Sequence, residues 1–157
     1  MKRKHLFSAL AAALIVLGCG AANAGQAINE AGAVTCATDK WNETEPEKGH
    51  KLVDYAGRCV CVDNNAAVPS RPHDCVGKYE FMPDGSWKGG GTCTSAYKDG
   101  NTLNMTFEEG SHLKASVYKI TGGSGRYQGA SGGGTYVCDS LSDTLCGGRF
   151  EGRVELQ

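Results

Sequence analysis

The sequence predicts an all-β fold of seven to nine short strands, arranged as a small β-barrel or a β-sandwich. Short stretches of alternating apolar and polar residues recur at near-regular spacing, which is typical of a β-barrel or β-sandwich. No stretch shows the 3.6-residue periodicity of an amphipathic helix. Glycine accounts for 23 of the 157 residues, and this content disfavours long helices and favours turn-rich β-structure.

The chain begins with the three parts of a secretory signal peptide. Lys2-Arg3-Lys4 is basic, residues 9–17 are apolar, and Ala22-Asn23-Ala24 supplies a small-residue cleavage site. The apolar part is shorter than the roughly 20 residues that a membrane-spanning helix needs. We therefore expect a cleaved signal peptide over residues 1–24 and a periplasmic or secreted protein without a membrane span. The alternative is a lipoprotein anchored through Cys19, because the sequence before this cysteine resembles a lipoprotein signal.

The remaining chain is expected to form one β-barrel domain over residues 33–157, preceded by a flexible N-terminal tail over residues 25–32. Residues 33–38 are apolar enough for a short first strand. Residues 39–50 contain four acids and a proline, so we expect an exposed loop there.

The next stretches alternate strands with turns. Residues 51–62 predict one bulged strand or two short ones, because Gly57 interrupts the apolar pattern. Residues 64–74 carry two prolines and predict a loop. Residues 78–82 alternate, and an Asp-Gly turn then separates them from the extended residues 86–97, which is a strong hairpin signal.

The C-terminal third predicts further strands. Residues 103–108 alternate regularly, and residues 113–120 form the next expected strand after a turn at Glu109-Gly110. The acids Glu108 and Glu109 are interpreted as a solvated strand end. Residues 150–156 alternate between apolar and charged side chains, and such a last strand favours a closed barrel because an exposed edge promotes aggregation.

Seven cysteines follow the signal peptide, and an exported protein is expected to oxidise them to disulfides. An odd number allows at most three bridges and leaves one thiol. Cys138 and Cys146 flank a short polar turn and form the best single candidate pair. Cys59 and Cys61 lie two residues apart, so on a strand they share a face and would take different partners. The candidates are Cys36, Cys59, Cys61, Cys75, Cys93, Cys138 and Cys146.

A family resemblance comes from the segment Ile120-Thr121-Gly122-Gly123-Ser124-Gly125-Arg126-Tyr127-Gln128-Gly129-Ala130. It resembles the signature of the allene oxide cyclase and dirigent-like β-barrel superfamily, in which Thr-Gly-Gly-Thr/Ser-Gly ends a strand and an aromatic residue and Gly-Ala follow. Uncharacterised exported bacterial proteins share this signature. The resemblance implies an eight-stranded antiparallel barrel with an apolar interior, and it transfers no catalytic residue to this chain.

The same segment has a structural interpretation that does not depend on the family. Gly122, Gly123, Gly125 and Gly129 permit a tight hairpin and close backbone approach, and Tyr127 can pack back over the turn. A phosphate-binding loop is disfavoured because neither the Rossmann nor the Walker spacing is present.

Large apolar side chains on the expected strands could line a cavity in the barrel. The candidate ligand-binding residues are Tyr79, Phe81, Trp87, Tyr97, Met105, Phe107 and Tyr118. The alternative is that these side chains simply fill the core, since an eight-stranded barrel is just wide enough for that.

Two hypotheses for the function follow. The first is a non-catalytic binding or structural module whose partner is a small apolar molecule. The second is a cyclase or isomerase acting on such a molecule inside the barrel. A polar, water-accessible cavity with a buried carboxylate would favour the enzyme. Glu80 is a candidate only if it faces inward, and its alternation with Tyr79 and Phe81 argues against that.

Other functions are disfavoured. Loss of the three basic residues in the signal peptide changes the formal charge from −1 to −4, which argues against a nucleic-acid partner. The histidines are scattered, and Cys59 and Cys61 lack a second pair at zinc-like spacing, so we expect no metal site. The compact run His73-Asp74-Cys75 is the strongest metal-ligand candidate. We predict neither a cofactor nor a catalytic residue.

Overall fold

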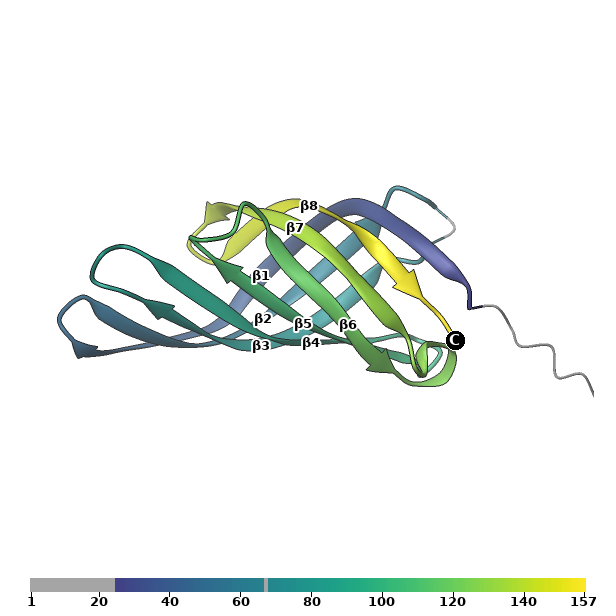
Figure 1. Cartoon of the computed structure of the whole chain (residues 1–157), viewed down its shortest axis with the longest axis horizontal. Coiled ribbons are helices and arrows are strands. Elements are labelled where there is room, and N and C mark those ends of the chain that lie inside the picture. Colours follow the sequence, from purple (N-terminus) through teal and green to yellow (C-terminus); the bar gives the residue numbers. More distant parts are fainter. Residues whose placement is uncertain (1–24, 67) are drawn as a thin grey trace, which may run out of the picture.

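The computed structural model describes residues 25–66 and 68–157. The predicted signal peptide and Cys19 lie outside these residues. Eight strands and one short 3₁₀ helix form the fold (Figure 1). The elements are β1 (Ala27–Glu47), β2 (His50–Asp63), β3 (Arg71–Phe81), β4 (Trp87–Ala96), β5 (Thr102–Gly110), β6 (Ser116–Gly123), η1 (Gly125–Tyr127), β7 (Ser131–Ser142) and β8 (Leu145–Glu155). In the described part of the chain, no helix has the length and apolar character needed to cross a bilayer.

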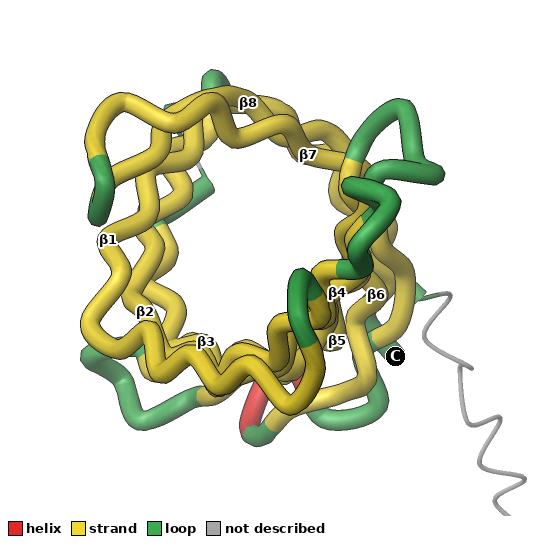
Figure 2. The backbone as a smooth tube through the Cα atoms, turned by 90° about the vertical axis from the view of Figure 1, so that its left-hand side faces the viewer, coloured by secondary structure: helices red, strands yellow, loops and turns green. Residues whose placement is uncertain are grey.

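The strands close into an antiparallel barrel in chain order. Each strand pairs with the next one along the chain, and β8 pairs back onto β1 from Ala27↔Glu155 to Ala37↔Leu145. Figure 2 shows the resulting ring of strands seen from one end. The closed eight-stranded barrel confirms the predicted fold class.

Alternation along each strand separates an interior face from an exterior face. On β5, Leu103, Met105 and Phe107 are buried, while the residues between them are exposed. The same two-residue period on β3 buries Arg71 and His73. Successive side chains of a strand point to opposite faces, so every second residue of these strands projects into the barrel.

The N-terminal part of the domain differs from the prediction. Residues 25–32 do not form a flexible tail, because β1 begins at Ala27 and pairs with β8 from there onward. The expected loop over residues 39–50 is mostly strand, since β1 continues to Glu47. This end of β1 pairs with β2 in a long hairpin that extends beyond the other strands on the left of Figure 1. The β1 side chains from Asp39 to Glu47 are exposed, whereas Val53 on the β2 arm is buried.

Three disulfides join neighbouring strands, which confirms the expected number of bridges. Cys36 is bonded to Cys59, Cys75 to Cys93, and Cys138 to Cys146. The last bridge is the pair that the sequence favoured. Among the cysteines that the structure describes, Cys61 is left as a buried free thiol.

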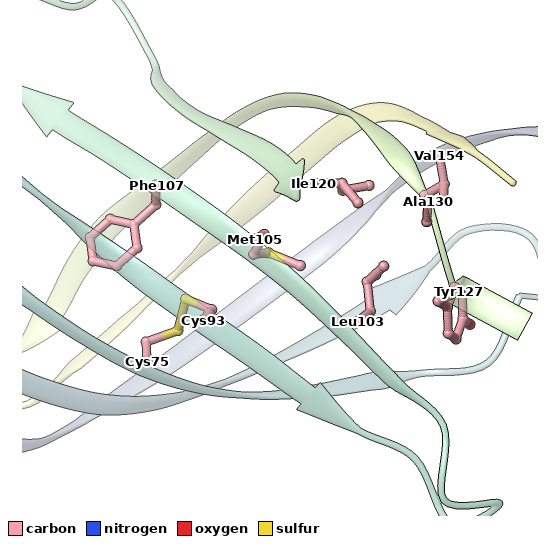
Figure 3. Packing of buried hydrophobic residues seen from close by; sticks show 9 residues of the cluster. All are labelled: Cys75, Cys93, Leu103, Met105, Phe107, Ile120, Tyr127, Ala130 and Val154. Carbon is pink, nitrogen blue, oxygen red and sulfur yellow. A yellow bond between two sulfur atoms is a disulfide. The ribbon is translucent and has the colours of Figure 1, made fainter. Parts of the chain in front are cut away.

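One end of the barrel is filled with side chains. Leu103, Ile120, Tyr127, Ala130 and Val154 are buried there against one another (Figure 3). Tyr127 belongs to η1, which connects β6 to β7 across this end. Tyr127 is 8% exposed.

The glycines of the same turn serve two different purposes. Gly122, Gly125 and Gly129 have positive φ angles of 128°, 58° and 71°, a region that favours glycine. Gly123 instead permits close approach, because a Cβ atom there would lie 2.1 Å from the carbonyl oxygen of Thr102.

Candidate functional site

The barrel contains a cavity of about 530 Å³ at the end opposite η1. Its lining includes Trp41, Asp143 and Leu145, which are exposed, so the cavity reaches solvent at this end. Pockets for small molecules measure about 300–1,000 Å³. The lumen is therefore filled at one end and hollow at the other.

Six aromatic side chains from five consecutive strands form one wall of the cavity. They are Trp41, Tyr55, Tyr79, Phe81, Trp87 and Phe107. Tyr79 lies at their centre, with ring centroids 5.4 Å from Trp41, 5.6 Å from Tyr55 and 6.2 Å from Trp87. Gly89 on the neighbouring strand makes room for Tyr79, since a Cβ atom at this position would lie 2.0 Å from the ring.

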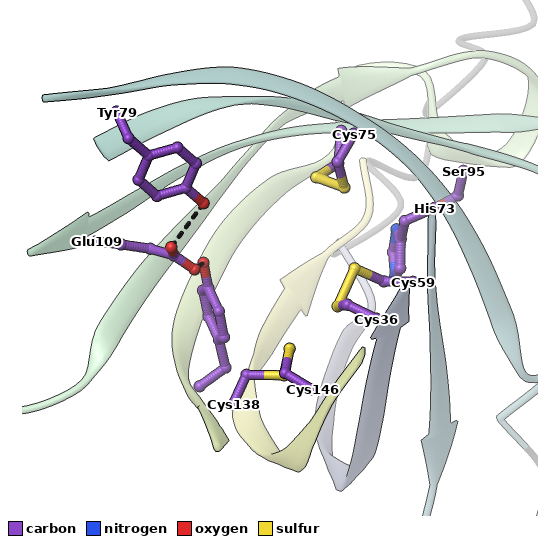
Figure 4. The surroundings of a disulfide bond; sticks show 11 residues. Cys36, Cys59, His73, Cys75, Tyr79, Ser95, Glu109, Cys138 and Cys146 are labelled. Carbon is purple, nitrogen blue, oxygen red and sulfur yellow. Dashed lines mark hydrogen bonds between the residues drawn. A yellow bond between two sulfur atoms is a disulfide. The ribbon is translucent and has the colours of Figure 1, made fainter. Parts of the chain in front are cut away.

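Glu109 projects into the cavity beside this aromatic wall. Tyr79 donates a hydrogen bond to Glu109 Oε2 at 2.7 Å (Figure 4). Tyr136 donates a second hydrogen bond to Oε1. Burial raises the pKa of both tyrosines, and the charge of Glu109 and these hydrogen bonds raise it further. Both phenols consequently stay protonated and act as donors to the carboxylate.

A second carboxylate lies deeper in the lumen. Arg71 Nη1 donates a hydrogen bond to Glu30 Oε2, and the hydroxyl of Tyr118 donates one to Oε1. The side chain of Glu30 is 1% exposed and that of Arg71 is 7% exposed. Arg71 also lies over the ring of Phe150, 5.4 Å from its centroid. The two opposite charges form a buried ion pair, so neither charge is left uncompensated.

His73 is buried against the same interior. Its Nδ1 forms a hydrogen bond with Ser95 Oγ at 2.7 Å. Burial lowers the pKa of His73 to about 4, with a further contribution from nearby Arg71, so its ring is neutral at neutral pH. The sequence His73-Asp74-Cys75 does not form one cluster, because Asp74 is exposed on the opposite face of β3 and Cys75 is oxidised.

Sulfur atoms gather on another part of the cavity wall. The Sγ atoms of Cys36, Cys138 and Cys146 lie within 4.8 Å of one another. All three belong to disulfides (Figure 4), so they offer no thiolate to a metal. Burial raises the pKa of the free Cys61 thiol to about 11 against the lowering effect of Arg71. Its burial also disfavours an intermolecular disulfide.

Six of the seven candidate ligand-binding residues line the cavity. They are Tyr79, Phe81, Trp87, Met105, Phe107 and Tyr118. Tyr97 does not, because it follows the end of β4 and stacks on Tyr127, with their centroids 5.1 Å apart. Glu80 lies on the outer face of β3, where it pairs with His50 and Lys88, in agreement with the alternation of the sequence.

The polar residues of the cavity were not identified from the sequence. Glu109 is not part of a solvated strand end, whereas its neighbour Glu108 is, with a side chain that is 61% exposed. The alternation of β5 continues from Phe107 to Glu109 and could have placed this carboxylate inside. Glu30 was assigned to a tail, although it follows Ile28 at the same two-residue spacing.

Comparison with known proteins supports the fold. No protein-family model and no curated protein matches the chain. The solved structure of the pterocarpan synthase dirigent protein GePTS1 is similar, with a TM-score of 0.56 and 10% identity over 84% of this chain and 91% of that chain. That of the pterocarpan synthase dirigent protein PsPTS1 has a TM-score of 0.50 and 12% identity over 83% and 94%. The barrel thus has the fold of dirigent proteins.

Proposed function

We propose that this chain is an exported protein that binds a small, mostly apolar molecule in its barrel. The observation that carries this proposal is the cavity of about 530 Å³, which is open at one end and has an aromatic wall. A barrel with a filled core would have side chains throughout its length, whereas here Leu103 and Ile120 fill only the end near η1. Three disulfides and the predicted signal peptide support a periplasmic or secreted location.

Binding can be tested with a neutral apolar dye and a substitution that fills the cavity. Thr38 lines the cavity, while Thr35 on the same strand faces outward. We expect N-phenyl-1-naphthylamine to increase its emission and shift it to the blue with the unmodified protein and with Thr35→Phe. Thr38→Phe should reduce the affinity by about tenfold, because the added ring occupies space that the dye needs. Equal binding by all three proteins would contradict the proposal.

An enzyme is the second candidate, and the carboxylates inside the barrel favour it. For an enzyme, the sequence leads us to expect a polar, water-accessible cavity with a buried carboxylate. Glu30 is buried and Glu109 is partly buried in a cavity that reaches solvent, so the carboxylate and the access to water are present. The cavity wall is mostly apolar, so the remaining requirement, a polar interior, is not met. We therefore favour the binding function over the cyclase or isomerase function. The two solved structures described above are pterocarpan synthase dirigent proteins, which supports keeping this candidate.

An isomerisation, including a ring closure that releases no group, leaves the mass of a molecule unchanged, and this provides a test. A ligand that copurifies with the protein can be incubated with the unmodified protein and with Glu109→Gln, then separated by chromatography with mass detection. If the protein is an enzyme, we expect a product of the same mass and a different retention time, which the variant forms more slowly. An unchanged ligand, or equal conversion by both proteins, would contradict a catalytic role for Glu109.

A further inference from the structure

The ionisable groups of the cavity do not balance in charge. Among the described residues that line it, three carboxylates, Glu30, Glu109 and Asp143, accompany a single guanidinium, Arg71. Arg71 is already paired with Glu30. His73, which also lines the cavity, is neutral at neutral pH because burial lowers its pKa to about 4. The cavity is therefore negatively charged.

Glu109 has hydrogen-bond donors but no counter-ion. Its partners are the hydroxyls of Tyr79 and Tyr136, which supply dipoles and no positive charge. None of the described lysine, arginine or histidine side chains forms a salt bridge with Glu109. Each carboxylate oxygen can accept more than one hydrogen bond. A partly buried charge without a counter-ion is costly even when it is hydrogen-bonded, so a cationic ligand would gain by approaching Glu109.

The aromatic wall adds a second attraction for the same charge. Tyr79 connects the two features, because its hydroxyl is bonded to Glu109 and its ring contacts the rings of Trp41, Tyr55 and Trp87. The faces of aromatic rings carry a negative electrostatic potential and attract cations, most strongly for tryptophan. A cationic group next to Glu109 would therefore lie against aromatic rings as well.

We propose that the ligand is an organic cation, an alkyl or aromatic ammonium compound with an apolar body. Its charged group lies between Glu109 and the aromatic wall, and its apolar part occupies the remaining lumen. This inference rests on the proposed binding function and adds the charge of the ligand to it. A neutral molecule of the same shape would gain the apolar contacts alone, and an anion would be repelled.

The test compares three probes of similar size on the full mature chain with its disulfides intact. Phenyltrimethylammonium is the cation, tert-butylbenzene is its uncharged carbon isostere, and benzenesulfonate is an anion. Trp41 and Trp87 are the two tryptophans of the chain, and both line the cavity, so their fluorescence reports on occupancy. We expect the cation to bind about tenfold or more tightly than the isostere, and benzenesulfonate to bind most weakly.

Two neighbouring glutamates provide a matched pair of variants. Glu109→Gln should weaken binding of the cation by about tenfold and leave binding of tert-butylbenzene unchanged, because only the charge is removed. Glu108→Gln alters an exposed acid on the outer face of the same strand, and it should change neither affinity. The unchanged affinity of Glu109→Gln for the isostere would show that the cavity is intact.

The possible outcomes separate this inference from the proposed function. Equal affinity for the cation and the isostere, or equal losses in both glutamate variants, would overturn the cationic ligand and leave apolar binding in place. Failure of the cation, the isostere and N-phenyl-1-naphthylamine to bind would overturn both proposals.

Discussion

Charged side chains inside the barrel determine much of its chemistry at the scale of single residues. The Glu30–Arg71 pair is almost completely buried. Removing one member of a buried ion pair leaves the other charge uncompensated in an apolar environment, which destabilises the fold. Replacing both members with apolar or uncharged side chains can leave the stability nearly unchanged. The pair therefore adds little net stability of its own, but neither member can be removed alone without a large loss of stability.

Arg71→Met tests this effect on folding. We expect it to lower the free energy of unfolding by about 3–5 kcal/mol, because Glu30 loses its counter-charge while it stays buried. Equilibrium unfolding in urea without reductant measures the loss. The double variant Glu30→Gln/Arg71→Met should recover most of it. Arg58→Met breaks an exposed pair with Asp39 and should cost much less, and an equal cost for both pairs would contradict this account.

His73 gives a pH dependence with a defined sign. Its pKa is about 4 in the folded protein against 6.5 for the unperturbed side chain. The unfolded chain therefore binds a proton before the folded protein does as the pH falls below 6.5. The contribution of His73 to the free energy of unfolding is therefore complete above pH 6.5, and it declines by about 3 kcal/mol as the pH falls to 4.

His73→Gln isolates this contribution, because glutamine does not titrate. We expect the difference in unfolding free energy between the unmodified protein and the variant to be constant above pH 6.5, to change between pH 6.5 and 4, and to level off below. Urea unfolding at intervals of half a pH unit measures it. A difference that is the same at every pH would show that His73 is not held neutral by burial.

The strands show what the sequence could predict at the scale of elements. Where apolar and polar residues alternate, as in β5 from Leu103 to Phe107, both the strand and its buried face were predictable. Where the inward position carries a charge, as at Glu30 and Arg71, the alternation was hidden and the segment resembled a tail or a loop. Arg71, which pairs with Glu30, is 41 residues away along the chain. A local sequence pattern does not indicate a pair that is so far apart in the sequence.

The first residues of β1 provide a direct test of this element. Residues 27–32 are paired with β8, although their sequence suggested a flexible tail. We expect the backbone amides of this segment that donate to β8 to exchange with deuterium as slowly as those in the middle of β5. Mass spectrometry of peptides after deuterium labelling measures the rates. Exchange as fast as at Lys98 and Asp99 in the exposed turn after β4 would show that the barrel is open between β1 and β8.

At the scale of the whole molecule, the two ends of the barrel differ. The end near η1 is packed with Leu103, Ile120 and Val154, while the opposite end keeps an aromatic wall around open space. Strand count and alternation predicted a closed barrel, but they did not distinguish a filled interior from a hollow one. That difference depends on inward glycines such as Gly89 and Gly152, which leave room for the ring of Tyr79 and the hydroxyl of Tyr118. Their effect appears only when strand neighbours are known.

Native mass spectrometry of protein purified from its own host tests the central claim, a barrel that holds a small molecule. We expect a mass that is lower by six hydrogens than that of the reduced chain, as three disulfides require, with a bound small molecule. The fraction of protein that carries the adduct should be unchanged in Thr35→Phe and clearly lower in Thr38→Phe, in line with a tenfold loss of affinity. A bare mass in all three proteins, or an adduct that Thr38→Phe retains in full, would contradict the claim that this cavity is the binding site.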